Sequence, residues 1–133
     1  MPCAYEIDST RRLVYCRCLA PLTAIDLLKW RDALQRDQRF HSTFSLVHEM
    51  EAAVGDVSAH VVHELRMTSP FLKVTPRAFV AAEPNHFGVA RTFRVQRELS
   101  GDISDARVCR SLEEALDWLG VTGYQPTNLT KVV

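Results

Sequence analysis

The stretch of residues 44–65 (FSLVHEMEAAVGDVSAHVVHEL) most constrains the fold, because it reads as a strand, a polar turn and the start of a helix. Residues 44–50 show the alternation that is typical of a strand. Ser58 then stands where it can cap a helix that we expect to span Ala59–Met67. A strand that leads into a helix is the unit of a parallel α/β sheet, so this segment predicts an α/β fold.

Similar segments precede and follow this unit, and we expect one domain that spans residues 1–133. The expected strands are residues 5–8, 13–19, 44–50, 77–82 and 106–109, and the expected helices are residues 22–35, 59–67, 86–99 and 112–119. The order is therefore β-β-α-β-α-β-α-β-α. A polar turn between the first two strands indicates a hairpin, whereas alternating strands and helices favour parallel pairing. We predict a mixed five-stranded sheet, mostly parallel, with an antiparallel N-terminal hairpin.

Two of the expected helices carry clear terminal signals. Thr23 can cap the first free amides of its helix, and Asp26 favours the positive end of the helix dipole. Ser111 and Glu114 have the spacing of a capping box, and Gly120 is placed to end the last helix. These signals set the helix boundaries more sharply than periodicity does.

Charge and hydropathy exclude some classes of partner. The chain has 16 basic and 16 acidic residues, which gives no global field to attract nucleic acid or an anionic membrane. No apolar run approaches the roughly 20 residues that a membrane span needs. The N-terminal residues lack the basic and then apolar layout of a signal peptide. We therefore expect a cytoplasmic protein that neither binds nucleic acid nor crosses a membrane.

The chain has four cysteines, Cys3, Cys16, Cys18 and Cys109, which we expect to be free thiols in a reducing compartment. Cys16 and Cys18 lie two residues apart on an expected strand, so their side chains share one face. Such a pair can bind a soft metal, but no second ligand pair follows at zinc spacing. We interpret the cysteines as small buried side chains, and we predict no metal or cofactor.

The named segments resemble the SpoIIAA-like superfamily, which includes the STAS domains and the STAS/SEC14-type bacterial proteins. Three stretches carry the resemblance: YEIDSTRRLVYCRCLAPLTAIDL at residues 5–27, FGVARTF at residues 87–93 and VCRSLEEALDWLG at residues 108–120. They are similar to the first hairpin and helix, the start of the third helix, and the last strand and helix of that superfamily. The resemblance implies a non-catalytic regulatory fold whose members often form homodimers.

In STAS domains of the sigma-factor system, a partner kinase phosphorylates a serine at the start of the second helix. The usual setting is Asp-Ser-Ser-Gly, and the matching residues here are Asp56, Val57, Ser58 and Ala59. Asp56 and Ser58 match, whereas the first serine and the glycine are replaced. The alternative for Ser58 is a helix cap that contributes about 1 kcal/mol, and the replaced neighbours favour the cap.

Further candidate binding residues lie in and before the expected third helix. The free amides near Ser58 and near Asn85 can accept an anion. Phe87 can contact an apolar ligand held between the third helix and the sheet. Arg91 lies in the family-like stretch and begins a basic stripe with Arg94 and Arg97, for which a solvated helix face is the simpler interpretation.

Histidines give a weaker indication of metal binding or catalysis. His60 and His63 lie three residues apart and share a helix face, with His48 or Glu49 as a conceivable third ligand. Glu64 follows the second histidine, so the segment is not the H-E-x-x-H motif. A solvated or interface helix face is the interpretation that we favour.

Three functions follow, in order of preference. The first is a non-catalytic STAS-like regulatory or protein-binding module that uses the turn at residues 54–59 and the second helix, and that pairs as a homodimer. The second is a SEC14-like domain for an apolar small ligand or lipid, which a cavity lined by Phe71, Phe79, Phe87 and Phe93 would favour. The third is an enzyme that uses His60, His63 and Glu49. The sequence contains no stronger catalytic motif, so we predict no catalytic residue.

Overall fold

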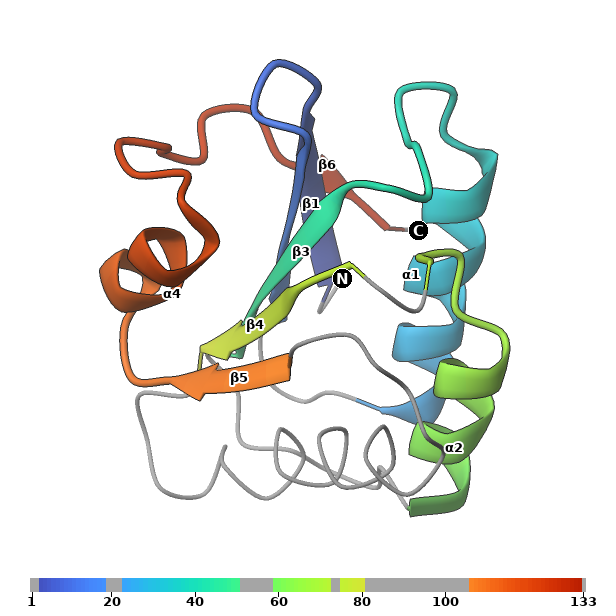
Figure 1. The fold of residues 1–133 in the computed structure, drawn as a ribbon. Coiled ribbons are helices and arrows are strands. Elements are labelled where there is room, and N and C mark those ends of the chain that lie inside the picture. The colour runs from blue at the N-terminus through green and yellow to red at the C-terminus, as the bar shows by residue number, and fades with distance from the viewer. Residues whose placement is uncertain (1–2, 19–22, 51–58, 73–74, 81–105, 133) are drawn as a thin grey trace.

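The computed structural model describes residues 3–18, 23–50, 59–72, 75–80 and 106–132, which form a mixed six-stranded sheet with helices on both faces (Figure 1). The strands are β1 (Cys3–Asp8), β2 (Leu13–Cys18), β3 (Ser45–Met50), β4 (Arg77–Val80), β5 (Ala106–Cys109) and β6 (Thr130–Lys131). The helices are α1 (Ala24–Arg36), α2 (Ala59–Met67) and α4 (Leu112–Leu119). None of the helices in these ranges is long and apolar enough to cross a membrane.

The strand order is β5-β4-β3-β2-β1-β6. The predicted hairpin is confirmed, because β1 pairs with β2 in antiparallel fashion. The predicted parallel part is confirmed as well, since β2, β3, β4 and β5 pair in parallel with their neighbours. The expected third helix, at residues 86–99, lies outside the described residues.

The prediction of five strands, with antiparallel pairing only in the hairpin, is wrong. β6 adds a sixth strand that pairs antiparallel with β1, with Thr130 beside Tyr5. A strand of two residues has no periodicity to read. Besides the backbone pairing, Glu6 in β1 contacts the segment before β6, because its carboxylate accepts hydrogen bonds from the Thr127 and Asn128 amides at 2.8 and 2.9 Å.

The predicted Thr23 cap of α1 is confirmed, and Asp26 makes it a full capping box, which was not predicted from the sequence. The Thr23 hydroxyl accepts a hydrogen bond from the Asp26 amide at 3.3 Å, and the Asp26 carboxylate accepts one from the Thr23 amide at 2.9 Å. Both bonds satisfy amides that have no partner within the helix. Leu27, Trp30 and Leu34 are buried against the sheet, as their helical spacing predicts.

At α4 the prediction is confirmed in part. Ser111 accepts from the Glu114 amide at 3.1 Å. In a capping box the Glu114 carboxylate would accept from the amide of Ser111 itself. Here it accepts instead from the amide of Arg110, the residue before the cap, at 3.0 Å. Gly120 ends the helix with φ of 74°, the left-handed conformation that glycine adopts without strain.

Side chains alternate between the two faces of the sheet, and each face carries its own core. Val14, Cys16 and Cys18 pack with α1 and α2, whereas Leu13 and Tyr15 pack with α4. Figure 1 shows α4 on one side of the sheet and α1 with α2 on the other. The face that a residue occupies therefore decides which helices it can meet.

The first residues after α2 hold this helix against α1. The Arg31 guanidinium donates to the Thr68 hydroxyl at 2.6 Å, and the Gln35 amide donates to the Thr68 carbonyl at 3.4 Å. Leu65 is buried in the core between the helices and the sheet. The position of α2 is thus set at its carboxyl end by both packing and hydrogen bonds.

Candidate functional site

The five residues that the sequence nominated as regulatory or binding candidates lie outside the described residues. They are Asp56, Ser58, Asn85, Phe87 and Arg91. The turn at residues 54–59 falls almost wholly in the same category, with α2 described from its first residue onward. The roles assigned to these side chains stay predictions.

The second group of candidates is described, and its members are far from a common site. His60 and His63 are exposed on α2, which packs on the side of the sheet that also carries His48. Glu49 faces the opposite side, where its carboxylate accepts a hydrogen bond from the Tyr15 hydroxyl. The sheet therefore separates Glu49 from the two histidines.

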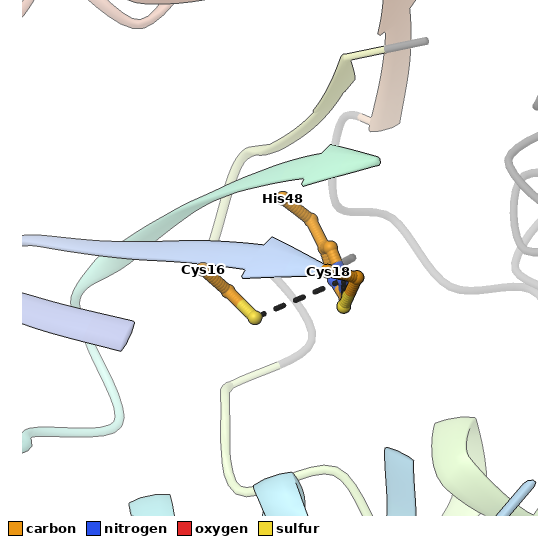
Figure 2. Close-up of side chains that lie close together, drawn as sticks. All are labelled: Cys16, Cys18 and His48. Carbon is orange, nitrogen blue, oxygen red and sulfur yellow. Dashed lines mark hydrogen bonds between the residues drawn. The ribbon is translucent and has the colours of Figure 1, made fainter. Parts of the chain in front are cut away.

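A different group converges in the core. Among the described residues, Cys16, Cys18 and His48 are the one set of three potential metal ligands whose ligand atoms all lie within 4.8 Å of one another. The two cysteines lie on β2, and the histidine lies on the adjacent strand, β3, where it is the register partner of Cys16. Figure 2 shows the three side chains pointing toward one another from these two strands.

The distances in this thiol–imidazole cluster are short. The Cys18 sulfur lies 2.9 Å from His48 Nε2, and the Cys16 sulfur lies 3.8 Å from the same atom. Cys3, opposite Cys18 in the hairpin, places its sulfur 3.4 Å from the Cys18 sulfur. Three thiols and one imidazole therefore meet on the sheet face that α1 covers.

All four side chains are removed from solvent, and their surroundings favour the neutral thiol. Burial raises the pKa of Cys16. The hydrogen bond with Cys16, followed by burial, raises the pKa of Cys18, and the hydrogen bond with Cys18, followed by burial, raises the pKa of Cys3. Since the thiolate is the nucleophile, the metal-free cluster is poorly suited to nucleophilic catalysis.

Aromatic packing fixes the imidazole. The ring of His48 is near Trp30 on α1 and Phe79 on β4, with ring centroids 5.3 and 6.2 Å away. Only 2% of His48 is exposed. This close packing limits rotation of the ring and so keeps Nε2 near the two cysteines.

A cavity of about 30 Å³ is lined in part by His48. Its wall is apolar, with Phe71 and Phe79 among its members, and it also includes Arg77. The Arg77 guanidinium donates to the Ser69 hydroxyl and to the Leu72 carbonyl, each at 3.2 Å. Room of this size suits one or two water molecules.

Sequence reasoning found parts of this cluster and missed the whole. It placed Cys16 and Cys18 on one strand face, and it considered His48 only as a ligand beside His60 and His63. The pairing of β2 with β3, in the register that sets Cys16 beside His48, is a long-range contact with no local signal. The position of Cys3 could have been predicted, because the register of the expected hairpin places it opposite Cys18.

Comparisons with protein-family models, with curated proteins and with solved structures gave no match for this chain. Any function must therefore be inferred from the residues that the structure describes.

Proposed function

We propose that this chain is a non-catalytic protein-binding module of the STAS type and that α2 supplies its binding surface. The observation that supports this is an exposed stripe along one face of α2. The stripe consists of His60, His63, Glu64 and Met67. These positions have the spacing of residues that lie one above another on a helix.

The stripe has the character of an interface rather than of a purely solvated face. Met67 is 63% exposed, which is unusual for a large apolar side chain, and methionine adapts readily to a partner surface. Leu72, in the loop after α2, is exposed as well. Because Leu65 and Thr68 hold α2 in place, a partner would meet a preformed surface and not have to order it.

The partner that we propose first is a second copy of the chain. A twofold pair places the same surface on both subunits, so a single exposed stripe is enough to form it. In such a pair α2 would lie against α2, and the preceding turn with Asp56 and Ser58 would lie at the rim. A cytoplasmic location, expected from the sequence, is part of the same proposal.

Sedimentation velocity over a range of protein concentrations tests the pairing. We expect the wild type to form a dimer and Met67→Asp to shift it to the monomer, because the substitution places a charge in the interface. Ile25→Asp on α1 is the matched control, since Ile25 is also 63% exposed. A wild type that stays monomeric at high concentration, or two substitutions with equal effects, would refute the proposed surface.

A SEC14-like role in binding an apolar small ligand ranks second. The observation in its favour is that the cavity beside His48 includes Phe71 and Phe79, two of the four expected phenylalanines. Phe87 and Phe93 lie outside the described residues. The volume of about 30 Å³ is far below the roughly 300–1,000 Å³ of a typical ligand pocket, so an acyl chain would require the cavity to open.

A further inference from the structure

We infer that Cys16, Cys18 and His48 form a binding site for a thiophilic metal ion, zinc(II) or copper(I). This inference is independent of the proposed protein-binding role, because it rests on the buried face of the sheet and not on α2. Thiolate and imidazole ligands are those that select these two ions over the harder magnesium and calcium.

The geometry is close to that of a metal site. With Zn–S near 2.3 Å and Zn–N near 2.0 Å at a tetrahedral angle, sulfur and nitrogen ligands lie about 3.5 Å apart. The observed separations from His48 Nε2 are 2.9 Å for Cys18 and 3.8 Å for Cys16, on either side of that value. Lengthening the Cys18 separation by about 0.6 Å and shortening the Cys16 separation by about 0.3 Å would reach the coordination distances.

The backbone supports such a small adjustment. Cys16 and His48 are paired across two neighbouring strands, and Cys18 is the next residue on the same face of β2. His48 keeps its orientation through the packing of Trp30 and Phe79. The movement therefore falls on the cysteine side chains, each of which moves its sulfur by rotation about the Cα–Cβ bond.

Charge also fits a buried site. Zinc binding displaces one proton from each of Cys16 and Cys18, and both protons go to solvent. Two thiolates, a neutral imidazole and Zn²⁺ then sum to no net charge, which a site with exposures of 2% or less can accommodate. Copper(I) with the same ligands carries one negative charge, so charge balance favours zinc.

Cys3 is the nearest further ligand. Its sulfur lies 3.4 Å from that of Cys18 but is not part of the group in which all ligand atoms lie within 4.8 Å. If it turned toward the ion it would complete a Cys₃His set, one of the common structural zinc sets. Copper(I) needs no fourth ligand, so replacing Cys3 should weaken the binding of zinc but not that of copper(I).

Equilibrium dialysis of chelator-treated, reduced protein against zinc chloride, followed by elemental analysis, tests the site. A second arm supplies copper(I) through a colorimetric copper(I) chelator. We expect one ion per chain in at least one arm. Cys18→Ser and His48→Gln should bind at least about a hundredfold more weakly, since losses of supporting residues alone cost about 10- to 100-fold. Cys3→Ser should weaken the zinc arm only.

Two control variants are available in the chain. Cys109 is fully buried in the core on the other face of the sheet. Cys109→Ser therefore has the same destabilising effect as other substitutions of a buried thiol but leaves the proposed site unchanged. The double variant His60→Gln/His63→Gln removes the exposed histidines of α2. Both controls should keep the full metal content of the wild type.

Wild-type protein alone provides a further readout if the site variants fail to fold. Zinc added in weak buffer should release one proton for each thiol that binds it, two from Cys16 and Cys18 and a third when Cys3 completes the set. Cobalt(II) should give a thiolate-to-metal charge-transfer band. The inference is overturned if the wild type retains no ion in either arm, or if no proton release accompanies binding. It is also overturned if Cys18→Ser and His48→Gln bind as the wild type does, or if Cys109→Ser loses the ion equally.

Discussion

Asp37, the residue that ends α1, links that helix to the first strand, and its replacement by asparagine should destabilise the fold measurably. The Tyr5 hydroxyl donates to the Asp37 carboxylate at 2.8 Å. Arg39 donates from its amide at 3.0 Å and from its guanidinium at 3.0 and 2.7 Å. Asparagine keeps the size of the side chain, so the substitution removes charge without creating a cavity.

The magnitude follows from how exposed each partner is. Tyr5 is 4% exposed, and its hydroxyl can still donate to the amide oxygen of an asparagine, so the substitution loses only the added strength of a charged acceptor, about 1 kcal/mol. The Arg39 side chain is 48% exposed, and solvent screening limits this ion pair to about 0.5–1 kcal/mol. Asp37→Asn should therefore lower the free energy of unfolding by about 1.5–2 kcal/mol at neutral pH.

The same interactions predict how the effect depends on pH. Hydrogen bonds from Arg39, aided by Tyr5, hold the pKa of Asp37 well below its usual range. The folded state thus binds fewer protons than the unfolded state in acid, and the contribution of Asp37 is complete only above about pH 4. As the pH falls below that value, the difference between wild type and Asp37→Asn should shrink.

Urea unfolding at pH 7 and at pH 3 measures both quantities. Asp8→Asn is a suitable comparison, because Asp8 forms an ion pair with Arg11 at 2.9 Å in the exposed hairpin turn without a buried hydroxyl partner among the described residues. The reasoning fails if Asp37→Asn costs no more than Asp8→Asn. It also fails if the cost of Asp37→Asn is the same at both pH values.

Three further substitutions test the packing, the last helix and the sixth strand. Leu34→Ala, at a fully buried position of α1, should cost about 2–5 kcal/mol in urea unfolding, and a cost below 1 kcal/mol would contradict its placement in the core. Gly120→Ala should cost about 1 kcal/mol by thermal unfolding, and Gly120→Asn less, because a Cβ there meets no atom within 4 Å and only the positive φ opposes it. Glu6→Ala removes the acceptor for two amides that precede β6. Hydrogen exchange should then become faster at the Val132 amide, which donates to the Cys3 carbonyl at 3.0 Å. Unchanged exchange would mean that backbone pairing alone holds β6.

Local signals in the sequence determine much of the architecture. α2 and α4 begin and end where the sequence predicted, and Thr23 caps α1 as expected. These features depend on residues within four positions of one another, so their physics is visible in the sequence. The sixth strand was missed because its contacts are long-range: the hydrogen bond from the Thr127 amide to Glu6, for example, joins residues 121 positions apart.

The candidate metal site divides in the same way between sequence and tertiary structure. The period of a strand was enough to place Cys16 and Cys18 on one face. Only the parallel register of β2 and β3 brings His48 Nε2 within 2.9 Å of the Cys18 sulfur, and only the sheet separates Glu49 from His60. Strand order and register are set by the packing of the whole core, which no short stretch of sequence contains.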